Sequence, residues 1–149
     1  MEVEVSSVHM STRAAAIARA AHRGQVDKAG RPYVEHPARV AARLAGDDVA
    51  VSVAWLHDVV EDSEVSLLGL AEEFPVEVVR AVDALTRRAG ESSERYYARV
   101  RSDALALRVK LADVADNSDP VRLAELDTEV RERLTRKYEH ARLVLMEGV

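Results

Sequence analysis

The chain has 149 residues, of which 48% are hydrophobic and 32% charged, and its formal net charge at pH 7 is −5. This composition predicts a soluble globular chain with its own hydrophobic core and excludes a disordered one. The negative charge argues against broad binding to nucleic acid, which requires a clustered basic surface. The lack of cysteine excludes disulfides and thiolate metal sites.

No stretch approaches the ~18 uninterrupted apolar residues that a membrane-spanning helix needs. The first residues also lack the basic-then-apolar layout of a signal peptide. We therefore expect no contact with a membrane and a cytoplasmic location.

The spacing of apolar residues predicts an all-α fold. These residues recur every three or four positions, and extended alternating runs of β-branched residues are absent. We expect one domain over residues 1–149, a compact helical bundle, with the aperiodic residues 1–10 outside the helices. In chain order, the expected helices cover residues 12–22, 36–45, 47–62, 66–74, 75–88, 92–101, 102–117 and 128–146, with a short turn or helix from Pro120.

Capping residues support several of these boundaries. Thr12 is a candidate N-cap for the first helix, Asp47 or Asp48 for the third, and Ser102 or Asp103 for the helix that ends at residue 117.

The stretch "AWLHDVVED", residues 54–62, carries an unusual polar face. On a helical wheel, one half is apolar and the other half holds four groups that are acidic or able to bind metal: His57, Asp58, Glu61 and Asp62. An ordinary amphipathic helix with a solvated face is one interpretation. The other is a metal site, because this face contains no lysine or arginine and its groups would repel one another without a cation.

A second candidate is Asp113, which lies among apolar residues in "LALRVKLADVADN". A buried carboxylate needs a cation, a salt bridge or several donors, and Lys110 could supply a simple salt bridge. His36, in "YVEHPARV", lies at a loop-to-helix junction, where a histidine is usually only a polar loop residue. His22, at the end of the first helix, has the same ordinary interpretation.

Taken together, His36, His57, Asp58 and Asp113 would offer two imidazoles and two carboxylates from three helices. This mixed nitrogen and oxygen set suits manganese, iron or zinc better than calcium or magnesium. Four protein ligands on a six-coordinate ion leave positions open for water and substrate, which indicates catalysis.

Three segments, "HRGQVDKAGRPYVEHPARVA", "AWLHDVVEDS" and "RVKLADVADN", resemble the HD-domain hydrolases of the RelA/SpoT type in order and spacing. This family includes small single-domain alarmone hydrolases such as the metazoan SpoT homologue. The resemblance covers about residues 12–146. It implies a helical bundle that binds one metal ion, typically Mn²⁺, and directs water at a phosphorus atom of a phosphorylated nucleotide.

The resemblance also implies roles for individual residues. The metal ligands would be His36, His57, Asp58 and Asp113. The acidic pair that positions or deprotonates the water would be Glu61 and Asp62. The positions that contact the nucleotide or its phosphates would be Lys28, Asn117 and Tyr138, together with Arg87 or Arg88 for the distal phosphate.

The function that this implies is a (p)ppGpp 3′-pyrophosphohydrolase, with no synthetase or regulatory segment in the sequence. The chain departs from the family at Asp27, where an arginine usually helps to hold the base, and at Asn117-Ser118-Asp119-Pro120 in place of "NxxT". One alternative is therefore the same chemistry on another nucleotide or cofactor, such as ppApp, NADPH or a nucleoside phosphate. Another is a nucleotide-binding domain without catalysis.

Overall fold

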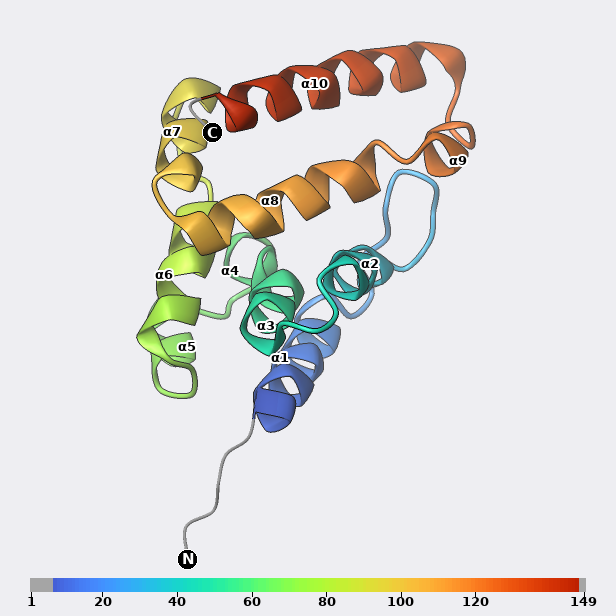
Figure 1. The fold of residues 1–149 in the computed structure, drawn as a ribbon. Helices are drawn as coiled ribbons and strands as arrows, with labels where there is room; N and C mark the ends of the chain where they lie inside the picture. The colour runs from blue at the N-terminus through green and yellow to red at the C-terminus, as the bar shows by residue number, and fades with distance from the viewer. Residues whose placement is uncertain (1–6, 148–149) are drawn as a thin grey trace, which may run out of the picture.

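The structure is a computed structural model that describes residues 7–147, with side chains from residue 10 onward. Within this range the regular elements are helices, apart from an isolated β-bridge between Val26 and Pro32. This confirms the predicted all-α class (Figure 1). The elements, in chain order, are α1 (Ser7–Ala21), α2 (Glu35–Arg43), α3 (Asp48–Leu56), α4 (Val59–Asp62), α5 (Leu67–Ala71), α6 (Val76–Leu85), α7 (Ser93–Arg101), α8 (Ala104–Asn117), α9 (Pro120–Leu123) and α10 (Thr128–Met146).

Helix α3 is the centre of the bundle. It packs against α1, α2, α6 and α8. Its sequence is apolar nearly all round, and Val53, Ala54 and Leu56 are fully buried. Because helices cover it on several sides, a residue at its end lies inside the protein rather than in solvent.

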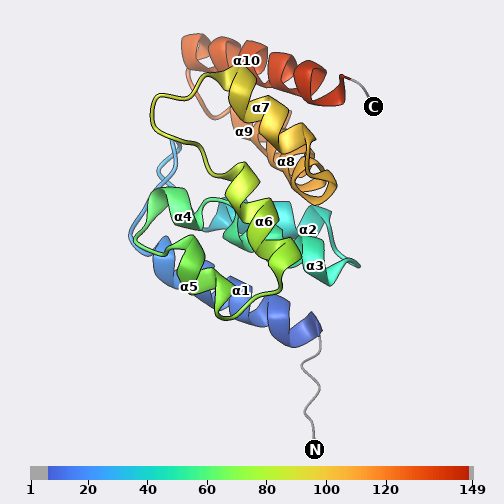
Figure 2. The same ribbon diagram turned by 90° about the vertical axis from the view of Figure 1, so that its left-hand side faces the viewer.

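Helix α8 joins two groups of helices. It contacts α2, α3 and α6 on one side and α7 and α10 on the other, so α10 forms the outer layer together with α7 (Figures 1 and 2). Residues of α8 therefore face the ends of α2 and α3.

Side-chain caps fix the starts of the helices that matter for this arrangement. Asp47 accepts a hydrogen bond from the backbone N–H of Ala50 at 3.1 Å, and Asp103 accepts one from Ala106 at 2.9 Å. Each was one of two predicted candidates, and the caps satisfy N–H groups that the helix itself leaves unpaired.

The predicted start of the first helix is wrong. Helix α1 begins at Ser7, and Thr12 lies inside it. Met10 is half-buried against the core, so the apolar stripe that includes Ala14 extends back by one turn. Residues 7–10, which were expected to lie outside the helices, therefore belong to one. The same expectation for residues 1–6 concerns residues outside the described range.

Several other boundaries differ from the prediction. Helix α2 ends at Arg43 and α5 at Ala71, both earlier than expected. Helix α6 ends at Leu85, so residues 86–88 belong to a loop. The helix expected over residues 47–62 is interrupted at His57 and Asp58, between α3 and α4. None of the described helices has the length and apolar content needed to cross a membrane.

Candidate functional site

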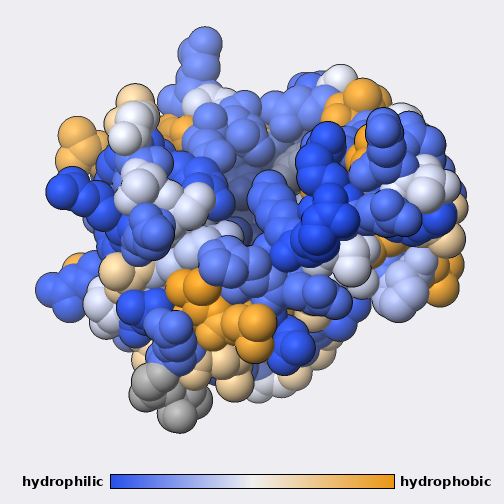
Figure 3. All heavy atoms as spheres, turned by 90° about the horizontal axis from the view of Figure 1, so that it is seen from above, coloured by the Kyte–Doolittle hydropathy of each residue, from blue (hydrophilic) through white to orange (hydrophobic). Residues whose placement is uncertain are grey.

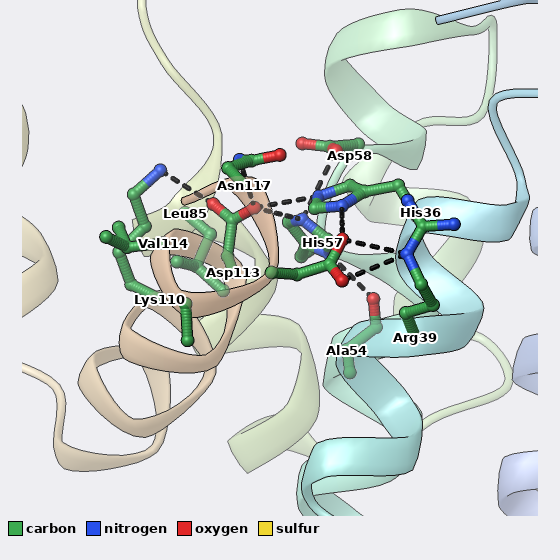
Figure 4. A network of polar contacts seen from close by, with 12 residues as sticks. His36, Arg39, Ala54, His57, Asp58, Leu85, Lys110, Asp113, Val114 and Asn117 are labelled. Carbon is green, nitrogen blue, oxygen red and sulfur yellow. Dashed lines mark hydrogen bonds and ion pairs between the residues drawn. The ribbon is translucent and has the colours of Figure 1, made fainter. Parts of the chain in front are cut away.

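Three parts of the bundle bring the four predicted metal ligands together. His36 is at the start of α2, His57 and Asp58 connect α3 to α4, and Asp113 is in α8. His36, His57 and Asp113 are buried, with 4%, 2% and 5% of their surfaces exposed. Figure 4 shows both imidazole rings directed toward Asp113.

The interruption after α3 orients His57. Its Nδ1 lies 2.6 Å from the carbonyl oxygen of Ala54, the residue three positions earlier, and donates a hydrogen bond to it. The helix resumes with the N–H of Asp62 bonded to the carbonyl oxygen of Asp58 at 3.0 Å. The side chains of two consecutive residues can thus approach the same point, although a continuous helix would turn them about 100° apart.

Asp116 fixes the orientation of His36, and sequence reasoning gave it no role. Its carboxylate lies 2.8 Å from Nδ1 of His36 and also accepts a hydrogen bond from Arg39 at 2.9 Å. The carboxylate is 1% exposed and accepts a hydrogen bond from Nδ1–H of His36. The Nε2 atom of the neutral ring therefore carries the lone pair that can bind a metal. Its position three residues after Asp113 on a core helix was a signal that it could share the site.

The donor atoms fit a divalent cation. In each ring Nδ1 already donates, so Nε2 of the neutral ring carries a lone pair. Nε2 of His36 lies 2.8 Å from a carboxylate oxygen of Asp113, a contact that either a proton on Nε2 or a bound cation stabilises. Nε2 of His57 is buried without a hydrogen-bond partner among the described residues, 3.2 Å from Asp58 and 3.6 Å from Asp113.

Donor atoms of His36, His57 and Asp58 all lie within 4.8 Å of one another. Asp113 stands beside this cluster, with the contacts to both rings just described. The described residues therefore contain a possible His/Asp metal site.

The pKa shifts of His36 and Asp113 reflect the attraction between the rings and the carboxylates. Burial opposes charge on His36, but its hydrogen bonds to Asp113 and Asp116 outweigh that effect and raise the pKa of the ring. Burial likewise opposes ionisation of Asp113, but Lys110 and then the two histidines hold the pKa of this carboxyl well below its usual value. The carboxylates are thus ionised and ready to bind a cation.

Neighbouring side chains hold the two carboxylates in place. Lys110 donates to Asp113 at 2.9 Å, and Asn117 donates to its other oxygen at 3.1 Å (Figure 4). The phenol of Tyr33 donates a short hydrogen bond to Asp58. Lys110 thus forms the salt bridge considered from the sequence, but the same carboxylate also faces both histidines.

The predicted acidic pair follows directly in α4. Glu61 and Asp62 are both exposed, and Glu61 accepts a hydrogen bond from the backbone N–H of Arg87 at 3.2 Å. Burial, and then the negative charges of Asp58 and Glu61, raise the pKa of Asp62. A carboxyl with a raised pKa beside a metal site is suited to accept a proton near neutral pH.

Two adjoining cavities open beside the ligands. The smaller, of about 160 Å³, is lined by the ligands His36, Asp58 and Asp113. The larger, of about 620 Å³, lies between the α1–α2 loop and the α9–α10 segment. Tyr33, Asn117 and Tyr138 line both, so the two cavities are direct neighbours. Viewed from the α10 side, the surface is hollowed and the rim is mainly hydrophilic (Figure 3).

Cations surround this space. Lys28 lines the larger cavity, while Arg87, Lys110 and Lys137 line the smaller one. The guanidinium of Arg87 lies over the ring of Tyr96, 4.0 Å from its centre. Lys137 was not among the residues singled out from the sequence, where one more cation on a charged helix carries no distinguishing signal.

Of the two arginines proposed for the distal phosphate, Arg88 is turned away. Its guanidinium donates to the carbonyl oxygens of Asp83 and Thr86, both at 2.7 Å, and thereby caps the end of α6. It lines neither cavity. Arg87 is the one of the pair that faces the ligands.

Asp27 has a local structural role that the sequence did not reveal. One of its carboxylate oxygens accepts hydrogen bonds from the N–H groups of Ala29 and Arg31, at 2.9 and 3.0 Å, and so closes the α1–α2 loop. The other oxygen lies 3.9 Å from Arg122 of α9. The carboxylate is therefore largely engaged within the wall of the larger cavity.

An all-α bundle that gathers histidine and aspartate donors from three segments, beside a cavity lined with cations, defines a class of helical metal-binding proteins. A family model described as "HD domain" matches residues 14–137 of this chain. The chain belongs to the HD-domain family.

Individual relatives support this assignment. The chain is 34% identical over 133 residues to the guanosine-3′,5′-bis(diphosphate) 3′-pyrophosphohydrolase of Haemophilus influenzae, covering 81% of this chain and 20% of the relative. It is 33% identical over 133 residues to the GTP pyrophosphokinase of Streptomyces coelicolor, covering 81% of this chain and 16% of the relative. The chain thus spans a fifth or less of the length of these curated relatives.

A solved structure extends the likeness to the whole fold. It belongs to a metazoan orthologue of SpoT, described as hydrolysing ppGpp and having a role in starvation responses. The two structures match with a TM-score of 0.78 at 22% sequence identity, over 98% of this chain and 89% of the other. This match confirms the HD-domain bundle predicted from the sequence.

Proposed function

We propose that this chain is a metal-dependent phosphohydrolase of a phosphorylated nucleotide, with removal of the 3′-pyrophosphate from (p)ppGpp as its reaction and Mn²⁺ as its metal. The observation that carries the proposal is the meeting of His36, His57, Asp58 and Asp113 at the end of a cation-lined cavity. The similarity to a relative named for this reaction supports it.

Neighbouring groups orient the side chains of the proposed metal ligands. A divalent ion held by these side chains would supply Lewis acidity, which makes water more acidic and draws charge from a phosphoryl oxygen. Asp116 and the Ala54 carbonyl each accept a hydrogen bond from Nδ1 of one ring, so Nε2 of both rings points toward the carboxylates. Lys110 and Asn117 hold Asp113 against rotation, which keeps the donor set in one geometry.

The remaining groups bind the substrate and move its proton. Arg87 and Lys137 face the smaller cavity and would hold phosphate oxygens, while Lys28 and Tyr138 line the space available to the nucleoside. In the reaction, the water oxygen bonds to the phosphorus next to the ribose and the bond from that phosphorus to the 3′ oxygen breaks. Glu61 or Asp62 takes the proton from the water and returns it to the 3′ oxygen, so ppGpp gives GDP and pyrophosphate.

The decisive experiment measures products. Purified protein with Mn²⁺ is expected to release pyrophosphate and GDP from ppGpp, and Asp58→Ala is expected to reduce this to the level of the metal-free protein. Exposed Glu129→Ala, in the first turn of α10, is the matched control and should retain activity. Binding of Mn²⁺ without turnover of any compound in a panel of guanine and adenine alarmones, NADPH and nucleoside phosphates would exclude the proposal.

A second candidate keeps the chemistry and changes the nucleotide to ppApp, NADPH or a nucleoside phosphate. It is favoured by Asp27, because the family's base-holding arginine is absent and the carboxylate in its place closes the loop instead. A higher kcat/KM for ppApp or NADPH than for ppGpp would establish this alternative. Tight binding of ppGpp with no product would instead favour a binding domain without catalysis.

A further inference from the structure

His22 is a buried histidine that the proposed reaction leaves unused. It follows α1 directly and is 2% exposed, although a histidine at a helix end is usually a surface residue. Its ring packs against Tyr33, with 5.0 Å between ring centres, and Tyr33 in turn donates to Asp58. His22 is therefore connected to the candidate metal site through Tyr33.

Gln25 determines which nitrogen of His22 carries the proton. The Gln25 amide nitrogen donates to two carbonyl oxygens, that of Asp62 at 3.0 Å and that of Ala21 at 3.3 Å. The amide oxygen must then face Nδ1 of His22, 2.9 Å away, and it can only accept. Nδ1 of His22 therefore holds the hydrogen, and Nε2 of the neutral ring carries a lone pair.

This lone pair has no partner among the described residues. Nε2 of His22 is a buried atom without a hydrogen bond, and such an atom costs folding free energy unless a donor reaches it. The nearby acidic residue is Asp62, because the Gln25 amide that contacts Nδ1 of His22 also donates to the Asp62 carbonyl oxygen. An ionised carboxylate cannot donate to Nε2, so a molecule with two donor hydrogens is needed between them.

We propose that His22 is a positioning residue for the acidic pair: its Nε2 and the Asp62 carboxylate accept the two hydrogens of one water molecule. Gln25 anchors the backbone carbonyl of Asp62 on the same side. A water that donates both hydrogens to the protein directs its oxygen lone pairs away from these acceptors and toward the substrate. This inference rests on the proposed function for its consequence in catalysis, but the hydrogen-bonding pattern can be tested without substrate.

Two substitutions distinguish the roles of the two ring nitrogens of His22. In His22→Asn the amide nitrogen can replace Nδ1 as the donor to Gln25, but nothing accepts at the Nε2 position. In His22→Gln the longer side chain places an acceptor near Nε2 and gives up the Nδ1 contact. We expect His22→Asn to lower kcat about 10- to 100-fold with KM and Mn²⁺ affinity unchanged, and His22→Gln to recover most of the loss. Exposed Arg23→Gln is the neighbouring control and should behave as the wild type.

A purely structural role predicts the opposite order, because His22→Asn preserves the link to Gln25. Wild-type turnover by His22→Asn, or a His22→Gln variant no more active than His22→Asn, would overturn the proposal. Long-range ¹H–¹⁵N NMR of the wild type provides a readout that needs no turnover. Neutral His22 should appear as the Nδ1–H tautomer, and an Nε2–H tautomer would overturn the inference. If no nucleotide is hydrolysed, the proposed function fails, and the NMR result still decides the hydrogen-bonding pattern.

Discussion

Lys137 differs from the other cations of the site in its surroundings. Lys110 is paired with the carboxylate of Asp113, whereas the printed contact of Lys137 is with the ring of Tyr138, 5.6 Å from its centre. Partial burial, and then the positive charges of Arg87, Lys110 and Lys28, lower the pKa of Lys137. An ammonium group that faces like charges beside metal ligands is suited to bind an anionic part of the substrate.

Replacing Lys137 should therefore weaken substrate binding. We expect Lys137→Gln to raise KM for the hydrolysed nucleotide about tenfold through the loss of one charge-assisted hydrogen bond, with a smaller effect on kcat. Lys137→Arg should stay within a few-fold of the wild type, since it keeps the charge. The adjacent exposed Arg136→Gln is the control, and steady-state kinetics at fixed Mn²⁺ provide the measurement. An equal KM in Lys137→Gln and the wild type would contradict this assignment.

At the level of elements, the loop between α6 and α7 places Arg87, and ion pairs hold this loop. Glu91 accepts hydrogen bonds from the guanidinium of Arg99 in α7 and from the backbone N–H of Arg88. Arg99 also donates to the carbonyl oxygen of Thr86 at 2.9 Å. The loop is thus tied to α7 on one side and, through Arg87 and Glu61, to α4 on the other.

The Glu91 pair should stabilise the protein only above acidic pH. The hydrogen bond from Arg99, and then that from Arg88, lower the pKa of Glu91 to about 2. The unfolded value is about 4.3, so the contribution is complete above that pH and is lost as the pH falls toward 2. Glu91→Gln should therefore melt at a lower temperature than the wild type at pH 7, with a difference that shrinks between about pH 4.5 and 2. Exposed Glu72→Gln serves as the control in the same thermal scans, and a pH-independent difference would refute this origin.

The helices could be predicted from the sequence largely because their signals are local. Apolar spacing and caps such as Asp103 define where α8 begins, and the range of α10 agrees with the prediction at both ends. The interruption at His57 could not be predicted, because helical periodicity continues through it, and the bond from the His57 ring to the Ala54 carbonyl is visible only in the structure. The ligand set was inferred from motifs, but the position of Asp116 against His36 depends on packing between α2 and α8.

For the whole molecule, the candidate metal site connects parts that are distant in the chain. Its donors come from α2, the α3–α4 junction and α8, and α8 also supports the outer layer of α7 and α10. A ligand that binds only the folded state stabilises it according to its concentration and affinity. Metal binding should therefore stabilise the entire bundle rather than one helix.

This stabilisation can be measured directly. Mn²⁺ at about 100 times its dissociation constant should add about 2.7 kcal/mol to the free energy of unfolding and raise Tm by about 5 to 10 °C. Chelation by EDTA should reverse the rise, and Asp58→Ala should show little of it. Glu129→Ala should respond like the wild type. The same rise in Asp58→Ala as in the wild type would show that the ion stabilises the protein from another location.

Because His57 and Asp58 are consecutive, the chain length through α3 and α4 governs both of them together. An inserted or deleted residue within this segment would displace two donors at once, whereas a change in the α1–α2 or α8–α9 connection can be absorbed before it reaches His36 or Asp113. Related chains of different length should consequently vary in those outer connections and keep the spacing through α3 and α4 constant.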